Sequence, residues 1–286
     1  LDQVDRGMGA LDRAIAEMLP SPFASAMVEG PIEKGLDLTR GGAVYNSTGV
    51  QLIGFANVAD SLNAIEKAVF QQKRLSVEDL AECLADDWED SEGIRSHLLR
   101  EIPKYGNDDP EADAMAARVL THFCDEVLRH RNFRGGSFWP GIFSVGFHVA
   151  LGAFSGASPD GRRAGEVLGN GITPGSGYAS SGATALLNSV TRLPVGRAHN
   201  GTTLNHRVQP RWLRPEALAS LMRTYFELGG SQVQFNIIDT ETLRDAQRNP
   251  EAYRDLVVRV SGYSALFTEL SELAQEEIIS RMEYQA

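Results

Sequence analysis

Apolar side chains recur at helical spacing over much of the chain. Leu11, Ile15 and Leu19 share one face of a helix that Pro20 ends, and Leu62, Ile65 and Val69 repeat the pattern. The spacing predicts helices over residues 1–19, 24–29, 59–72, 77–87, 92–102, 110–131, 215–228, 240–247 and 266–280.

Local signals support two of these helices. Ser76, followed three residues later by Asp79, has the pattern of a capping box at the start of a helix. Pro215 opens the helix that Gly229-Gly230 ends. The short apolar run at residues 233–238 is a candidate buried strand, and residues 253–260 lead up to Gly262. Helices that alternate with short apolar strands indicate the α/β class.

The character of the chain changes at Asn132. Glycine, proline and serine become dense over residues 132–210, and the predicted elements shorten. Aromatic and aliphatic side chains are interleaved throughout, which is atypical of a disordered linker. We therefore expect loops packed around a site.

Composition narrows the possible functions. Hydrophobic residues make up 42% and charged residues 23% of the 286 residues, as in a soluble globular protein. The net charge of −11 argues against a nucleic-acid surface, and the sequence predicts no membrane span. The two cysteines form no metal or disulfide pattern, which suits the cytoplasm. Because the chain opens on Leu1 in a helical pattern, we expect the C-terminal part of a longer polypeptide.

The most informative stretch is Val257-Val258-Arg259-Val260-Ser261-Gly262-Tyr263-Ser264-Ala265. An apolar run enters one glycine, and an aromatic and small residues follow. One interpretation is a strand that ends in a glycine turn. The other is a glycine whose Cα loses a hydrogen atom, because the resulting radical is delocalised over the flanking amide nitrogen and carbonyl.

This stretch resembles the radical-bearing motif of the glycyl radical enzymes, the superfamily of pyruvate formate-lyase and the diol and glycerol dehydratases. Further motifs agree in order along the chain: Gly41-Gly42-Ala43-Val44-Tyr45-Asn46, Arg134-Gly135-Gly136, Pro159-Asp160-Gly161-Arg162, Asn200-Gly201-Thr202-Thr203 and Gln232-Val233-Gln234-Phe235-Asn236. The resemblance covers essentially the whole chain and is greater to the dehydratase-like branch. It implies that Gly262 is the radical residue.

The resemblance also implies a fold and a domain organisation. Residues 1–286 would be the C-terminal part of a ten-stranded α/β barrel. Within it we expect a helical half-barrel region at residues 1–131, a loop-rich pocket wall at 132–210 and a glycyl radical domain at 211–286.

The implied mechanism needs other proteins. In this family no cofactor is bound; a radical-SAM activating enzyme with an iron–sulfur cluster removes the glycine hydrogen. The radical then passes to a cysteine in a Gly-Cys-x-Glu type loop. Neither Cys83 nor Cys124 has that context, and both are expected to be buried packing thiols. The cysteine loop would therefore lie upstream of Leu1 or in a partner chain, and this chain alone is expected to be inactive. A homodimer is usual in the family.

The remaining site predictions are less specific. Arg134 beside two glycines suits an anionic substrate, or else is a loop arginine that binds carbonyls. The resemblance to family members that cleave sulfonates implies that Arg134 and Phe138 contact the substrate. Arg259, Ser261 and Tyr263 are expected to support the radical loop. Gln234 and Asn236 alternate along one strand and could bond that loop or neighbouring backbone. No metal ligands are predicted.

The expected activity is a lyase or dehydratase that cleaves a C–O, C–S or C–N bond of a small polar substrate. Alternatives are an isethionate-type sulfite-lyase, radical addition to fumarate and decarboxylation of an arylacetate. From another class, the chain could be a non-catalytic subunit that supplies the radical domain to a partner. A degenerate homologue without a radical is a further possibility, against which the intact motif counts.

Overall fold

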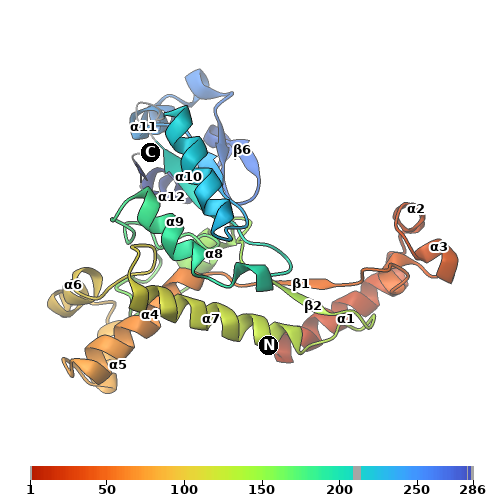
Figure 1. Ribbon diagram of the computed structural model, residues 1–286, viewed down its shortest axis with the longest axis horizontal. Coiled ribbons are helices and arrows are strands. Elements are labelled where there is room, and N and C mark those ends of the chain that lie inside the picture. Colours follow the sequence, from red (N-terminus) through yellow and green to blue (C-terminus); the bar gives the residue numbers. More distant parts are fainter. Residues whose placement is uncertain (1, 209–213, 282, 285–286) are drawn as a thin grey trace. The chain divides into compact units, whose positions relative to one another are not determined.

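The computed structural model describes residues 2–208, 214–281 and 283–284 (Figure 1). It divides into two compact units. The first comprises Leu1–Gln51, Thr121–Gly141 and Arg197–Asn200, and the second comprises Leu52–Leu120, Ile142–Gly196 and Gly201–Ala286. Each unit is described by itself.

The first unit is built from helices and one pair of strands. It holds α1 (Asp2–Met18), α2 (Pro22–Ala26), α3 (Pro31–Lys34), a 3₁₀ turn η1 (Leu38–Arg40) and the end of α7 (Pro110–Leu128). Strand β1 (Thr48–Gln51) pairs in parallel with β2 (Phe138–Gly141), with Thr48 opposite Phe138. The helix predicted at residues 1–19 is thus confirmed as α1.

The second unit begins with helices around an apolar core. Helix α4 (Phe55–Ala64) continues as a π-helix, η2 (Ile65–Gln71), and α5 (Val77–Ala85) and α6 (Glu92–Arg100) follow. Their buried side chains pack together with Trp88. The capping box is confirmed at α5, because Ser76 Oγ accepts from Asp79 N and Asp79 Oδ2 accepts from Ser76 N.

Short elements separated by loops follow, as the sequence predicts. They are α8 (Phe147–Ala153), α9 (Ala183–Thr191), η3 (Val195–Arg197) and β3 (Asn205–Val208). Strand β3 is central in a parallel sheet of order β4-β3-β7, where β4 is Gln234–Asn236 and β7 is Glu283–Tyr284.

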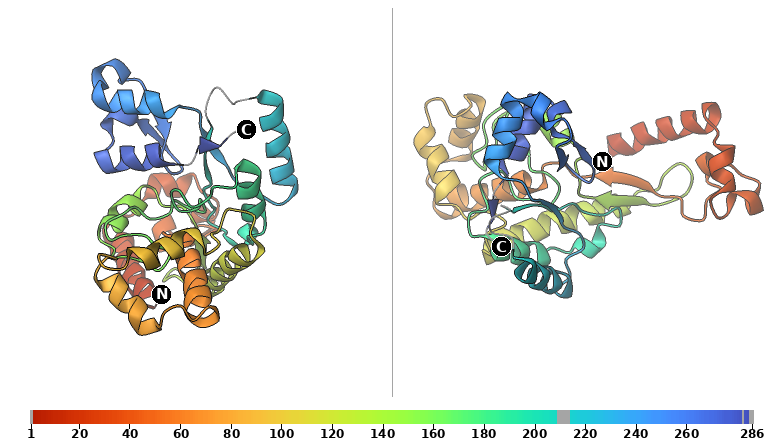
Figure 2. Two further views of the ribbon diagram at one scale, coloured as in Figure 1. Left: turned by 90° about the vertical axis from the view of Figure 1, so that its left-hand side faces the viewer. Right: turned by 90° about the horizontal axis from the view of Figure 1, so that it is seen from above.

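The last part of the chain forms a small helical layer around a hairpin. After α10 (Pro215–Glu227) and β4 come α11 (Thr240–Arg248), η5 (Pro250–Tyr253), β5 (Val257–Arg259), β6 (Ser264–Leu266), η6 (Phe267–Glu269) and α12 (Glu272–Ser280). Strands β5 and β6 pair antiparallel in the blue part of the chain (Figure 2). Buried residues of α11, β5, η6 and α12 form one core. The apolar face of the hairpin is thereby fixed against two helices.

One predicted helix is wrong at its start. The pattern predicts a continuous helix over residues 266–280, whereas the chain forms β6 and η6 before α12 begins at Glu272. Ser271 ends the irregular part, because its Oγ accepts from Ala274 N at 3.4 Å and caps the helix. Leu266 and Phe267 satisfy the helical spacing, but the hairpin and the core use them instead.

Helices and short, mostly parallel strands alternate, which confirms the α/β class. Among the helices of the described residues, none has the length and apolar character that a bilayer crossing needs.

Candidate functional site

Gly262 lies in the turn that joins β5 to β6. Arg259 pairs with Ser264, and Val260 N donates to Tyr263 O at 2.9 Å, so Ser261 and Gly262 form a two-residue connection. Gly262 has φ +82°, which a residue with a side chain adopts only at a cost. A Cβ there would meet only Thr203 Cγ2, at 3.7 Å. The turn therefore requires glycine for its conformation, and crowding plays no part.

Two of the predicted support residues, Gln234 and Asn236, bond a third, Arg259. The Asn236 amide bonds both main-chain groups of Arg259: Oδ1 accepts from its N and Nδ2 donates to its O, each at 2.8 Å. The guanidinium donates from Nε to Gln234 Oε1 and from Nη2 to Gly262 O, each at 2.9 Å. The amide side chains predicted on β4 thus hold strand β5 in place, and the Arg259 side chain binds the carbonyl of Gly262.

Ser261 and Tyr263 contribute differently. Ser261 is buried and its Oγ donates to Asn170 Oδ1 at 2.7 Å. Tyr263 is 39% exposed and bonds the turn through its main-chain carbonyl. Its ring lines a groove with α8 and α12, beside the turn.

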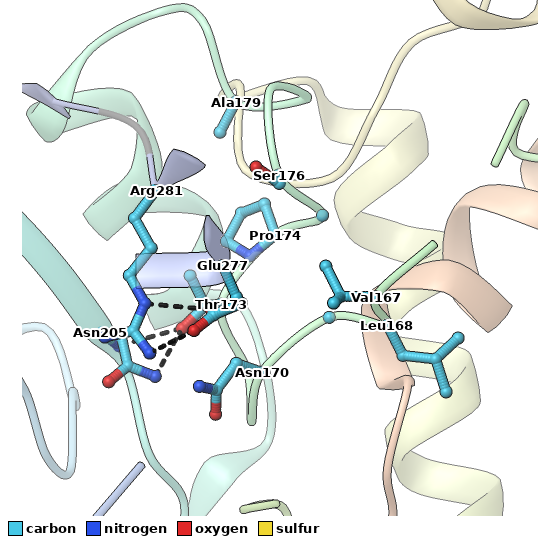
Figure 3. Close-up of a pocket in the computed structure, with 12 residues that line it drawn as sticks. Val167, Leu168, Asn170, Thr173, Pro174, Ser176, Ala179, Asn205, Glu277 and Arg281 are labelled. Carbon is cyan, nitrogen blue, oxygen red and sulfur yellow. Dashed lines mark hydrogen bonds and ion pairs between the residues drawn. The ribbon is translucent and has the colours of Figure 1, made fainter. Parts of the chain in front are cut away.

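A buried ion pair at the end of α12, which the sequence reasoning missed, holds the same turn: Glu277 lies on the helix and Arg281 directly follows it. Arg281 Nη1 donates to Arg259 O at 2.8 Å and Nη2 to Val260 O at 2.6 Å. Glu277 Oε2 lies 2.7 Å from Arg281 Nη2, and both side chains are less than 10% exposed (Figure 3). Their spacing of four residues on a helix just after the glycine motif was the available signal.

The pair lines a small cavity of about 30 Å³ together with Asn170, Thr173 and Asn205 (Figure 3). That volume suits a single water molecule with several polar partners. A water molecule there would have polar partners on both Asn170 and the ion pair.

Glu277 should make unfolding dependent on pH in the acid range. Burial alone would raise the pKa of this carboxyl, but Arg281 and His148 outweigh it and lower the pKa from 4.5 to about 2. Because the folded-state pKa is the lower one, the stabilisation is complete above about pH 4.5 and is lost as the pH falls towards 2. In the wild type, this carboxyl should lower the free energy of unfolding by about 3 kcal/mol as the pH falls from 4.5 to 2. In Glu277→Gln, which has no carboxyl at this position, that part of the loss should be absent. Urea unfolding of both proteins between pH 2.5 and 6 measures it, and parallel curves would contradict the assignment.

Arg134 and Phe138 belong to the first unit. Arg134 Nη1 lies 2.7 Å from Asp12 Oδ2, Nε donates to Asn46 Oδ1 at 2.7 Å, and Nη2 donates to Thr48 Oγ1 at 3.1 Å. All three guanidinium nitrogens are engaged within the unit, which favours the structural alternative. Phe138 is buried, with its ring edge-on to His130. Their role as substrate contacts stays a prediction.

Both cysteines are buried and unpaired, as the sequence predicts. Cys83 lies on α5 and Cys124 on α7. Burial raises the pKa of the Cys124 thiol to about 11, which disfavours the thiolate. Neither lies on an exposed loop of the kind that presents a reactive sulfur.

Two family models match the chain. Residues 1–152 match "Pyruvate formate lyase-like", and residues 168–268, which include the β5–β6 turn, match "Glycine radical". The probable dehydratase YbiW of Escherichia coli is 39% identical over 96% of this chain and 35% of its own length. The trans-4-hydroxy-L-proline dehydratase of Clostridioides difficile is 36% identical over 97% of this chain and 36% of its own length.

A solved structure agrees. The glycerol-bound form of the B12-independent glycerol dehydratase from Clostridium butyricum superposes with a TM-score of 0.94 at 42% identity, covering 97% of this chain and 36% of that chain. This confirms the fold as part of a glycyl radical enzyme barrel. The chain spans about a third of the length of the relatives it matches. It belongs to the pyruvate formate lyase-like family of glycyl radical enzymes and carries that family's glycine radical region.

Proposed function

We propose that this chain is the radical-bearing part of a glycyl radical lyase or dehydratase, with the radical on Gly262. The observation that carries the proposal is the turn itself. It falls within the matched glycine radical region, and four polar side chains bond the backbone of Gly262 and of the residues just before it: Asn170, Asn236, Arg259 and Arg281. A turn glycine with only a conformational role does not require so many restraints.

We propose that the cysteine and the activating enzyme are supplied from outside this chain. Gly262 is exposed in this chain, whereas a stored carbon radical must be kept from oxygen and solvent. We propose that a cysteine-bearing part, on the same polypeptide or on a partner chain, covers the turn and supplies the thiyl radical. A separate SAM- and iron–sulfur-dependent activating enzyme would remove the Gly262 hydrogen, and the cytoplasmic complete enzyme would form a homodimer.

The reaction proposed is removal of water from a small polar substrate. The thiyl radical takes a hydrogen atom from a substrate carbon. The hydroxyl on the neighbouring carbon then leaves as water, with a proton that the substrate itself gives up, and the thiol returns its hydrogen atom to the product radical, which restores the thiyl radical. The curated relatives reported above are dehydratases by name, which favours C–O cleavage over sulfite release, C–N cleavage, fumarate addition or decarboxylation. Arg134 and Phe138 remain candidates for substrate contact.

The test is turnover after anaerobic activation. The full-length polypeptide, or this chain with its cysteine-bearing partner, is activated with SAM and offered diols, hydroxyprolines, amino alcohols and sulfonates. The proposal expects a dehydrated product from one of the first two classes. Sulfite release would shift the proposal to a sulfite-lyase.

A non-catalytic complementing subunit is the second candidate, since the chain spans a third of its relatives and its own cysteines are buried. Activity that appears only when a separately encoded cysteine-bearing chain is added would favour it. Activity of a single polypeptide would exclude it.

A further inference from the structure

A buried polar network contacts the glycine turn at Val260 and Ser261. Its five members come from segments far apart in the chain but all belong to the second unit. Ser144 precedes α8, His148 lies on α8, Asn170 follows α8, Ser261 is in the turn and Glu277 lies on α12. All five are at most 7% exposed.

Asn170 is the member that touches the turn twice. Its Oδ1 accepts from Ser261 Oγ at 2.7 Å and from Ser144 Oγ at 2.8 Å, and its Nδ2 donates to Val260 O at 3.2 Å. The opposite orientation of the amide would place an oxygen against the Val260 carbonyl. The network thus permits one orientation, in which the side chain of Ser261 and the preceding carbonyl are bound by the same amide.

Ser144 connects this amide to α8. Its Oγ lies within hydrogen-bond distance of three groups: Asn170 Oδ1 at 2.8 Å, His148 Nδ1 at 2.8 Å and Ser261 Oγ at 3.0 Å. The other ring nitrogen of His148, Nε2, lies 3.5 Å from Glu277 Oε1, on the acid that pairs with Arg281.

We infer that Asn170, Ser144 and His148 are positioning residues of the glycine turn, which hold Val260 and Ser261 and so set the place at which Gly262 presents its Cα hydrogen. The positioning of the turn is independent of the proposed function, and only its effect on radical formation rests on that function. Buried polar groups are costly to leave unpaired, so the network tolerates few alternative arrangements. Hydrogen transfer depends steeply on the separation of the reacting atoms, which gives the positioning its value.

The first test measures the turn without any radical. In Asn170→Asp the second oxygen faces the Val260 carbonyl and the donor is lost. We expect the amide hydrogens of Arg259 and Val260 in the full-length protein to exchange about 10-fold faster, as for the loss of one buried hydrogen bond. Hydrogen–deuterium exchange with mass spectrometry on the peptide that spans residues 257–266 measures this. Ser144→Ala, which removes the shared hydroxyl, is the second variant and should act in the same direction.

Asn63→Asp is the matched control. Asn63 is equally buried, and its Nδ2 donates to Pro103 O at 2.7 Å in the helical core. We expect this variant to leave exchange at residues 257–266 unchanged. Unchanged exchange in both Asn170→Asp and Ser144→Ala, or an equal increase in Asn63→Asp, would overturn the inference, because the network would then be general core support.

The second test uses the radical. After anaerobic activation we expect Asn170→Asp to give several-fold less glycyl radical per protein than Asn63→Asp, by electron paramagnetic resonance. If the exchange results hold and no protein shows a radical, the positioning role stands and the proposed function fails. If the radical yield and the exchange of Asn170→Asp both equal those of the control, the positioning role fails and the proposed function stands.

Discussion

Gly262→Ala should abolish the glycyl radical and turnover while the protein still folds. Alanine at φ +82° costs about 1–2 kcal/mol, but its Cβ would meet only Thr203 Cγ2 at 3.7 Å, so no neighbour has to move. The radical is lost because alanine has a methyl group that disfavours the planar centre. Electron paramagnetic resonance after anaerobic activation, with circular dichroism of the same sample, measures both effects.

Strain at a positive φ could by itself reduce activation, so the experiment needs a control with equal strain. Gly229 has φ +97°, and a Cβ on it would meet no atom within 4 Å, so alanine there is strained without being crowded. It ends α10, away from the turn's hydrogen bonds. Gly229→Ala should therefore keep the radical. Loss of signal in both variants would attribute the effect to backbone strain and count against Gly262 as the radical residue.

Arg281→Met should be the most destabilising single change at the site. It removes the donors to the carbonyls of Arg259 and Val260 and leaves the Glu277 carboxylate buried without its main partner. Breaking one side of a buried ion pair costs about 3–5 kcal/mol. We expect a loss of that size in the free energy of unfolding, measured by urea denaturation of the full-length protein.

The double variant Arg281→Met, Glu277→Leu separates the two contributions. Removing the orphaned carboxylate should restore most of the stability, while the turn remains without its donors and the radical yield stays low. Arg254→Met is the matched control: Arg254 pairs with Glu251 on the surface, and both side chains are more than 70% exposed. Its loss should change stability by less than about 0.5 kcal/mol. An equal effect of Arg254→Met and Arg281→Met would contradict the account.

Sequence reasoning predicted the elements whose pattern is local. Helix α1 and the capping box of α5 were correct because a period of 3.6 and a cap need only neighbouring residues. The start of α12 was wrong because Leu266 and Phe267 fit the helical spacing equally well as hairpin and core residues. Only the pairing of Val257 with Leu266 and the core of the second unit decide between them.

For the candidate site too, the sequence predicts the residues with a local pattern and misses those that only tertiary packing brings to the turn. Arg259, Gln234 and Asn236 follow from the motif and from alternation along one strand, and the structure brings them together. Asn170 and Ser144 lie about a hundred residues before the turn, in irregular segments, so no periodicity connects them to it. Such contacts arise from tertiary packing alone.

The most direct measurement is electron paramagnetic resonance of the activated wild-type protein grown with ordinary glycine or with glycine deuterated at Cα. The hydrogen that remains on a glycyl radical splits its signal into a doublet, and deuterium, with its much smaller magnetic moment, should collapse the doublet to a single line. That collapse is the predicted result. A doublet unchanged by the label, or no radical although the activating enzyme works on a control protein, would contradict the claim that this chain stores a radical on glycine.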